Sequence, residues 1–420
     1  MWDSRGRPTV EVDVALACGA IGRAIAPAGA SKGSGEVVDL RDGGAAFGGY
    51  GVGRALAAVE GEIATALKGR DAQDQAAVDA LMVHVDGTGD RSRLGGNAIV
   101  ATSMAVLHAR AAARGLPLWR ELAGDQRVRL PLPEVQIFGG GAHAARRVDI
   151  QDFMVVALNA SSFSEAMAWT AEIYRAAGMS LARAGKLYGV ADEGGYWPHF
   201  ASNEEALAAV VRAIEDAGFD AGADVGVSLD VAASEFGRSG EYTLALDGKR
   251  LDTAEMIDML EKWIDAYAIV SLEDPVAEDD GAGFREAVRR FGRRCQIIGD
   301  DFLVTNASRV AKAAAEQSVS AVLIKPNQAG TVTEAYDALR AGKAAGLGTI
   351  VSARSGETED VTIAHLAVGW DAGQLKVGSF SRSERMAKWN ECLRIEESMG
   401  RDASFAGREA LALFASSPST

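Results

Sequence analysis

The sequence predicts an α/β protein in which a (β/α)8-type barrel follows a smaller α+β domain. Its 420 residues exceed the length of one typical domain. One strand pattern followed by helical patterns opens the chain, and short apolar runs that end in a polar residue then recur about every 25 residues, as a barrel of alternating strands and helices requires. We place the smaller domain at residues 1–125 and the barrel at residues 126–420.

The N-terminal part begins with residues 7–14, where apolar and polar side chains alternate as in a half-buried strand. A Gly-rich stretch at 28–53 follows, and we interpret it as a long mobile loop. Helical patterns then cover residues 52–67, 73–83 and 97–114. A strand followed by helices is typical of an α+β domain, and the two prolines of residues 130–133 predict a stiff joint to the barrel.

In the second part, short apolar runs repeatedly end in a polar or charged residue. The runs cover residues 225–230, 268–273, 296–300, 320–325, 349–352 and 374–376. Helical patterns lie between them, for example at 332–345. Because the active site of such a barrel lies at the carboxyl ends of its strands, we expect the polar residues that end these runs to share one site.

The composition indicates which partners the protein can bind and in which compartment it functions. With 43 Lys and Arg against 58 Asp and Glu, the net charge is −15, which disfavours binding to nucleic acid. Three widely spaced cysteines fit neither a disulfide framework nor a zinc site. Asp3 and Arg5 interrupt any signal sequence, and the longest uncharged run, 94–109, is shorter than the ~20 residues of a membrane span. We therefore expect a soluble cytoplasmic protein.

Three carboxylates, Asp230, Glu273 and Asp300, end three successive predicted strands. Three converging carboxylates cannot all stay ionised without a cation nearby. A hard divalent metal that prefers oxygen ligands, most simply Mg²⁺, would resolve this conflict. The three residues alone leave phosphoryl transfer, aldol chemistry and enolisation open.

Two lysines, Lys325 and Lys376, end later runs, and residues 352–355 between them read Ser-Ala-Arg-Ser. Arginine and serine beside a metal indicate a small substrate that carries a phosphate or a carboxylate. A lysine close to bound Mg²⁺ can have its pKa lowered enough to act as a base.

The sequence resembles the enolase (phosphopyruvate hydratase) family along nearly the whole chain. The motifs that carry the resemblance are residues 3–14, 29–31, 40–43, 140–143, 191–195, 229–236, 273–275, 300–301, 324–328, 354–360 and 382–385. The resemblance implies an enolase-type barrel with an α+β capping domain, assembled as a homodimer or a higher homo-oligomer. It also implies two Mg²⁺ ions in each active site and a hydro-lyase that acts on a 2-phosphoglycerate-type substrate.

The same resemblance implies a role for individual residues. Asp230, Glu273 and Asp300 would hold the first Mg²⁺, and Ser31 would help to bind the second. Lys325 would remove the α-proton and Glu193 would help hydroxide to leave, with Asp152 at the position of a family glutamate. The residues expected to bind substrate are His143, Lys376, Arg354, Ser355 and Lys32.

Four positions depart from the family pattern towards smaller side chains. Ala353 replaces a histidine, Asp152 a glutamate, Gly139 an asparagine and Gly35 a bulky residue. Because Lys32 also adds a positive charge, the interpretation that we favour is an extra anionic group on the phosphorus of the substrate. Carboxyphosphonoenolpyruvate synthase, an enolase paralogue of phosphonate antibiotic biosynthesis, is the family precedent for such a substrate.

Trp197 is a departure in the opposite direction, because it replaces a small residue after Asp192-Glu-Gly-Gly. Three alternatives stand beside the favoured interpretation. The first is an ordinary glycolytic enolase that converts 2-phosphoglycerate to phosphoenolpyruvate. The others are a non-catalytic enolase-like binding protein and a mandelate-racemase-like enzyme, and retention of the carboxylates and lysines disfavours the former.

Overall fold

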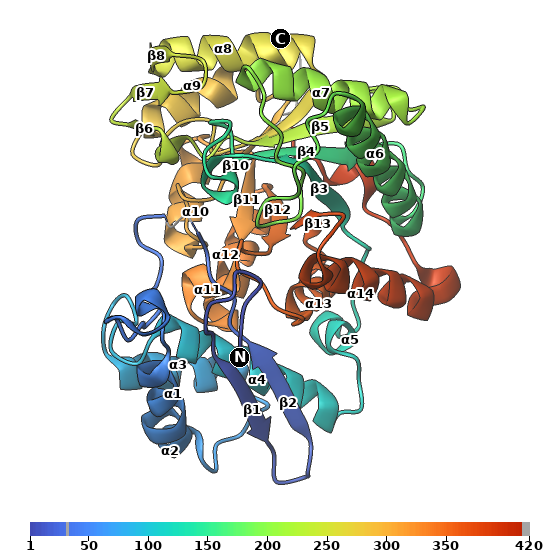
Figure 1. Cartoon of the computed structure of the whole chain (residues 1–420). Coiled ribbons are helices and arrows are strands. Elements are labelled where there is room, and N and C mark those ends of the chain that lie inside the picture. Colours follow the sequence, from blue (N-terminus) through green and yellow to red (C-terminus); the bar gives the residue numbers. More distant parts are fainter. Residues whose placement is uncertain (31–32, 414–420) are drawn as a thin grey trace.

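The computed structural model describes residues 1–30 and 33–413. Its N-terminal part packs against α11 (Pro326–Ala329) and α12 (Val332–Ala344) of the barrel part, below them in the view of Figure 1. The N-terminal part contains an antiparallel pair of strands, β1 (Glu11–Ala15) and β2 (Ile21–Ile25), which packs on α4 (Gly96–Ala113). The predicted strand at 7–14 therefore begins later than expected, and its partner β2 was not predicted. Helix α4 begins within one residue of the predicted 97–114.

The remaining N-terminal helices follow the predicted positions with one interruption. The region 52–67 is helical, but a π turn at Val59–Ile63 separates α1 (Gly53–Ala58) from α2 (Ala64–Leu67). Helix α3 (Gln75–Asp86) begins where the Asp74 carboxylate accepts a hydrogen bond from the backbone N–H of Ala77. It ends at Gly87, whose φ of 71° is the left-handed conformation that closes many helices. Helix α5 (Leu118–Ala123) completes this part.

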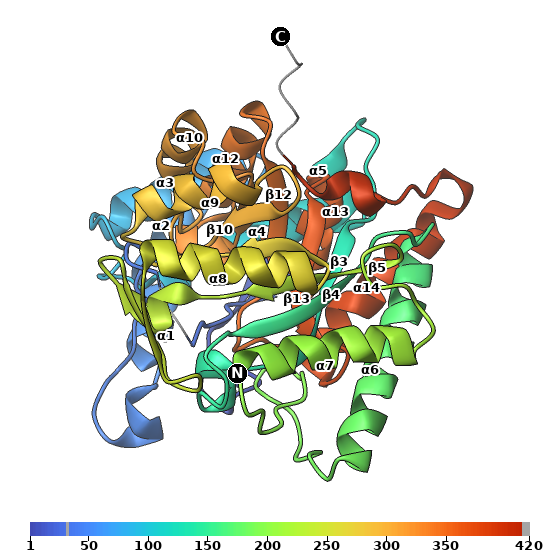
Figure 2. The same ribbon diagram turned by 90° about the horizontal axis from the view of Figure 1, so that it is seen from above.

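Eight strands form a closed barrel, which confirms the predicted fold class (Figure 2). In spatial order they are β10 (Gln296–Gly299), β11 (Ala321–Ile324), β12 (Gly348–Ser352), β13 (Gly373–Ser379), β3 (Leu132–Gly139), β4 (Asp152–Ala157), β5 (Val225–Asp230) and β9 (Ile269–Glu273). Strand β4 runs antiparallel to both of its neighbours, whereas the other neighbouring pairs are parallel.

The first two barrel strands were not predicted. Leu132 and Pro133, which we expected in a stiff joint, are the first residues of β3. This strand is buried along its whole length although it contains Glu134 and Gln136, so it shows no alternation of apolar and polar residues. A proline is tolerated near the start of a strand, where few ladder hydrogen bonds are lost.

Helices surround the barrel, and a small sheet lies beside it. The helices are α6 (Phe163–Arg183), α7 (Asn203–Asp216), α8 (Thr253–Ala266), α9 (Gly281–Phe291), α10 (Ala307–Ala315), α11 (Pro326–Ala329), α12 (Val332–Ala344), α13 (Thr362–Gly369) and α14 (Ser383–Met399). The sheet contains β6 (Gly237–Arg238), β7 (Glu241–Leu244) and β8 (Lys249–Asp252). Several helices begin with a side-chain cap, including a complete capping box between Asp252 and Glu255 at α8.

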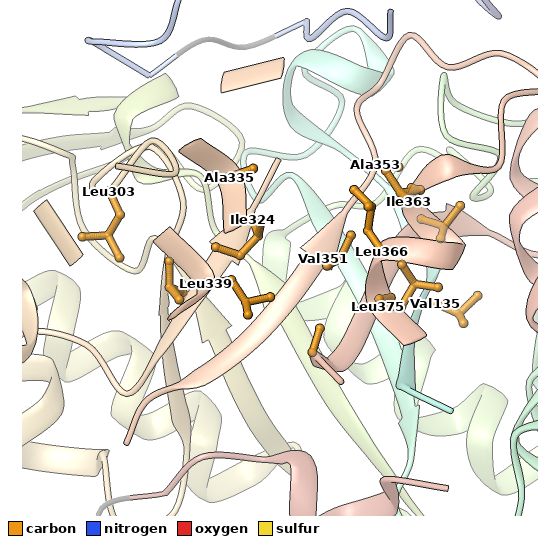
Figure 3. Close-up of a cluster of buried hydrophobic side chains, with 14 of the residues drawn as sticks. Val135, Leu303, Ile324, Ala335, Leu339, Val351, Ala353, Ile363, Leu366 and Leu375 are labelled. Carbon is orange, nitrogen blue, oxygen red and sulfur yellow. The ribbon is translucent and has the colours of Figure 1, made fainter. Parts of the chain in front are cut away.

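The core continues from the barrel strands into the surrounding helices (Figure 3). Ile324 and Val351 point from β11 and β12 towards Leu339 of α12 and Leu366 of α13, and all four side chains are at most 1% exposed. This packing fixes the strand ends on which the polar residues stand. In the part of the chain that the structure describes, no helix is long and apolar enough to cross a membrane.

Candidate active site

Most of the predicted polar residues meet in one pocket at the carboxyl ends of the barrel strands, and Glu273 and Asp300 adjoin it through Lys376 and Lys325. Residues from both parts of the chain line it, namely Gly29, Ala30, Gln151, Asp152, Glu193, Asp230, Lys325, Ser352, Ala353, Arg354, Ser355, Lys376 and Val377. Lys325 directly follows β11, Lys376 lies within β13, and Arg354 and Ser355 follow β12. The pocket therefore combines acidic and basic side chains from strands that are far apart in sequence.

Asp230 and Glu273 occupy paired register positions at the ends of β5 and β9. The Lys376 ammonium lies between them, 2.7 Å from a carboxylate oxygen of each and 3.5 Å from Asp152. Burial lowers the pKa of Lys376, but Asp230 and Glu273 outweigh burial, so its pKa lies well above the usual range. Lys376 is consequently a cation held by a ring of carboxylates.

Glu273 is fully buried, and burial together with the charge of Asp230 raises its pKa well above the usual range. One of its oxygens, Oε1, has no hydrogen-bond partner among the described residues. A buried carboxylate oxygen without a donor is costly unless a cation or another donor meets it. The oxygen donor set of Asp230, Glu273 and Asp300 therefore fits a hard divalent cation such as Mg²⁺.

Asp300 follows β10 and pairs with the Lys325 ammonium. Burial alone would raise the pKa of Asp300, but Lys325 and Arg354 lower it below its usual value. Burial lowers the pKa of Lys325, and Asp300 outweighs that effect, so the pKa of Lys325 is raised. For Lys325 to act as a base, the charge of Asp300 has to be engaged by another cation.

A second acidic cluster shares Asp300. One carboxylate oxygen each from Asp274, Asp300 and Asp301 lies within 4.8 Å of the others, and all three residues are buried. Asp274 accepts backbone hydrogen bonds from Asp300 and Asp301 at 2.9 and 2.8 Å. Burial and the neighbouring carboxylates raise the pKa of Asp301 to about 8 and that of Asp274 well above its usual value. Asp274 and Asp301 thus extend the acidic side of the site beyond Asp300, and neither was among the predicted metal ligands.

Arg354 and Ser355 form the other end of the pocket. The Arg354 guanidinium is 4% exposed and pairs with Glu36 at 3.1 Å, and it donates a second hydrogen bond to the side chain of Asn327 at 3.0 Å. Arg5 donates to the Ser355 hydroxyl at 3.5 Å. Fully buried Arg385 of α14 donates to the carbonyl oxygens of Arg354 and Ser355 at 2.7 and 2.6 Å, which fixes the turn that carries both residues.

Glu193 and Asp152, the two predicted catalytic carboxyls, also line the pocket. Glu193 is 6% exposed, and its carbonyl oxygen accepts the backbone N–H of Ser379 at 2.9 Å. Asp152 is fully buried at the start of β4 and accepts a hydrogen bond from the Gln136 amide. Both carboxyls raise the pKa of Lys376, which indicates that they lie close to its ammonium.

Three predicted site residues are only partly accounted for. Ser31 and Lys32 lie outside the described residues. His143 lies in the one-turn 3-10 helix Gly141–Ala144, but its side chain is not described.

The structure explains several departures from the family pattern. A Cβ at Gly139 would lie 2.7 Å from the Cβ of Ala191, so this glycine permits close packing and opens no space. At Gly35, a Cβ would lie 2.5 Å from the Arg309 guanidinium, which already fills that volume. These two glycines therefore do not enlarge the pocket as we expected.

Ala353 and Trp197 differ from those glycines. Ala353 lines the pocket and also belongs to the edge of the hydrophobic cluster near Ile363 (Figure 3). The Arg147 guanidinium packs over the Trp197 ring, with its Cζ 4.2 Å from the ring centroid. The Trp197 carbonyl accepts a hydrogen bond from Arg147 at 2.8 Å. Trp197 thus joins the segment that carries Glu193 to the segment that carries His143.

Sequence reasoning missed several residues that support the site. Glu134 lies in β3 at the register position of Lys376, and burial raises its pKa to about 7. Polar residues inside an apolar strand would have been the signal for Glu134 and Gln136. Glu36 gave no such signal, because its partner lies far away in the sequence. Arg385 belongs to the family motif at 382–385, but the sequence assigned it no role.

A closed barrel with buried carboxylates and lysines at its strand ends is the architecture of a barrel enzyme that acts on a small anion. The family model for the enolase C-terminal TIM barrel domain matches residues 127–413, and that for the enolase N-terminal domain matches residues 1–122. The chain is 47% identical to Enolase 1 of Desulfitobacterium hafniense (strain Y51) over 411 residues, which cover 97% of this chain and 94% of that protein. The chain belongs to the enolase family and is a carbon–oxygen lyase.

Proposed function

We propose that the chain dehydrates 2-phosphoglycerate to phosphoenolpyruvate. The observation that carries this proposal is the pair of buried lysines, Lys325 and Lys376, in one pocket with the Glu193 carboxyl. Removing a proton next to a carboxylate needs a base and groups that accept the new negative charge. The identity to a protein named Enolase 1 supports this substrate over the phosphorus-modified analogue that the sequence favoured.

The proposed roles divide along the pocket. Lys325 takes the proton from the carbon next to the carboxylate, and Lys376 binds that carboxylate. Glu193, assisted by Asp152, gives a proton to the departing β-hydroxyl, so that it leaves as water. Arg354 and Ser355 bind the phosphate, and the substrate-binding group also includes His143 and Lys32.

We propose magnesium as the metal cofactor, held by Asp230, Glu273 and Asp300, with Ser31 contributing to a second ion. When bound, Mg²⁺ stabilises the negative charge that develops on the substrate carboxylate. The proposal extends to a homodimer or higher homo-oligomer in the cytoplasm, built from a capping domain at 1–125 and a barrel at 126–420.

A second candidate is a substrate with an additional anionic group on phosphorus, in a phosphonate antibiotic pathway. Ala353 favours it, because the pocket wall carries a methyl group where the family has a histidine. Asp152 is one methylene shorter than the family's glutamate and favours it in the same way. The packing around Gly139 and Gly35 removes the support that those two positions gave to this candidate, and Lys32, its remaining support, lies outside the described residues.

The test is incubation of the purified protein with 2-phosphoglycerate and Mg²⁺, followed at the absorbance of the enolpyruvate product. A turnover above ~10 s⁻¹, the median for enzymes, supports 2-phosphoglycerate as the substrate. No turnover with this substrate but turnover of a carboxyphosphono analogue would select the second candidate. In parallel, Ala353→His should raise the rate with 2-phosphoglycerate only if the second candidate is correct.

A further inference from the structure

Glu36 is a buried carboxylate that the proposed reaction does not use. It belongs to the Gly-rich segment of the N-terminal part, but its side chain is only 5% exposed because it reaches into the barrel. Its two oxygens lie 3.1 and 3.2 Å from the two terminal nitrogens of Arg354. A carboxylate on both nitrogens occupies the same fork that a phosphate group would use.

Further contacts join Glu36 to the predicted metal ligand Asp300. Its Oε1 accepts hydrogen bonds from the backbone N–H of Gly33 at 3.0 Å and from the Gln328 amide at 3.2 Å. The same amide nitrogen of Gln328 donates to Asp300 at 2.9 Å. Glu36 therefore holds segment 33–37 on the barrel through the groups that form the anion and metal ends of the site.

We propose that Glu36 is an internal counter-anion that competes with a phosphate group of the ligand for Arg354. The competition links two events, since a phosphate that takes over the guanidinium releases the carboxylate anchoring segment 33–37. This inference rests on the proposed function for the assignment of Arg354 as the phosphate-binding residue. It identifies Glu36 as a residue that sets the affinity of the pocket for anions.

A matched control is available on the same segment. Glu278 of the barrel accepts hydrogen bonds from the backbone N–H and hydroxyl of Ser34 at 2.8 and 3.0 Å. Glu278→Gln weakens the attachment of the segment without removing the partner of Arg354. It therefore separates an effect of loosening the segment from an effect of removing the counter-charge.

The experiment is calorimetric titration of inorganic phosphate into the Mg²⁺-loaded wild type and into Glu36→Gln, Glu36→Asp, Glu278→Gln and Arg354→Met variants. Glu36→Gln should bind phosphate roughly 5- to 150-fold more tightly than the wild type, the range found for the coupling of two interacting ligands. Glu36→Asp, which keeps the charge, and Glu278→Gln should bind within about twofold of the wild type. Arg354→Met should lose most of the affinity.

Thermal unfolding supplies a second measurement if the wild type binds phosphate too weakly for calorimetry. Glu36→Gln should unfold at a lower temperature than the wild type without phosphate, because Arg354 loses its counter-ion, and should gain more from added phosphate. Unchanged or weaker phosphate binding by Glu36→Gln, with Arg354→Met impaired, would overturn this proposal alone. Unimpaired binding by Arg354→Met would overturn the assignment of Arg354 in the proposed function as well.

Discussion

Two buried arginines, Arg354 and Arg385, lie in contact and donate their hydrogen bonds to different kinds of acceptor. Arg354 lines the pocket and is countered by the carboxylate of Glu36. Arg385 lies behind it, fully buried, and donates its hydrogen bonds to three backbone carbonyl oxygens, those of Arg354, Ser355 and Val377, while its Nε lies 3.6 Å from the Glu384 carboxylate. Lys325 and Lys376 resemble Arg354, because their ammonium groups donate to carboxylates.

The difference bears on what each cation can do. A side-chain carboxylate can exchange its cationic partner for a metal ion at small structural cost. A substrate anion can also displace the carboxylate from that partner. Backbone carbonyls of a barrel turn cannot leave without unfolding that turn. We therefore expect cations paired with carboxylates to act in binding and chemistry, and the carbonyl-paired arginine to act in stability and in shaping the site.

The largest effect is expected at Lys325. Lys325→Met should lower kcat by ~10²–10⁴-fold, because a positioned base contributes about that factor. Circular dichroism of the variant should match the wild type, since the strand end and its core contacts remain. A rate within about tenfold of the wild type would contradict the role of Lys325 as the base. It would also contradict the expectation that cations paired with carboxylates act in binding and chemistry.

Arg385→Met should instead lower the free energy of unfolding by ~3–5 kcal/mol, as expected when a buried charged partner is removed. Three carbonyl oxygens lose their donor in this variant, and urea denaturation monitors the change. Arg394→Met, at an exposed position on the same helix, is the control and should change the free energy of unfolding by less than ~0.5 kcal/mol. An Arg385 variant as stable as this control would remove the contrast between the two arginines.

His365 is a buried base that carries no charge, and it extends the comparison with the buried lysines and arginines. Burial lowers the pKa of His365 to about 4, with His108 adding to the shift and Glu391 opposing it. Between pH 6.5, where an unfolded histidine titrates, and pH 4, the unfolded chain binds a proton that the folded chain does not. The free energy of unfolding should therefore fall by about 2–3 kcal/mol as pH decreases across this window.

Urea denaturation of wild type and His365→Phe at a series of pH values tests this expectation. The variant should show a flatter dependence on pH, whereas His84→Gln, at an exposed position, should retain the wild-type slope. Equal slopes for wild type and His365→Phe would show that His365 is not held neutral by burial.

The smallest effect is expected at the Trp197–Arg147 contact. Trp197→Ala should remove about 0.5–1 kcal/mol, the value of an exposed cation–π contact, and so change kcat/KM by up to about fivefold. Trp197→Phe, which retains an aromatic face, should recover part of that loss. A steady-state assay that gives equal losses for both variants would mean that the contact does not position the Glu193 segment.

The sequence predicts the barrel because most of its strands are apolar runs with a polar residue at the carboxyl end. The same feature identifies Asp230, Lys325 and Lys376 as residues of one pocket, since parallel strands bring their ends to one face. Strand β3 escapes prediction because the buried polar residues Glu134 and Gln136 interrupt its apolar pattern. Strand β4 is apolar after Asp152, but its polar residue stands at the start of the run and not at its carboxyl end. The chain also turns antiparallel at β4, which spacing alone does not reveal.

Side-chain partners between distant segments are the other part that sequence reasoning could not supply. Glu36 and Arg354 are 318 residues apart, and Arg91 and Glu334 are 243 residues apart. The glycines at 35 and 139 also seemed to open space, because the atoms that fill it belong to other segments. Small residues in a sequence therefore do not by themselves indicate a larger pocket.

The central claim is that Lys325 is the base and Glu193 the acid of one pocket. NMR measurement of deuterium exchange at C2 of 2-phosphoglycerate, in D₂O with Mg²⁺, tests it most directly. Glu193→Gln should exchange the C2 hydrogen while forming almost no phosphoenolpyruvate, and Lys325→Met should do neither. Exchange by Lys325→Met at the rate of Glu193→Gln would contradict the account.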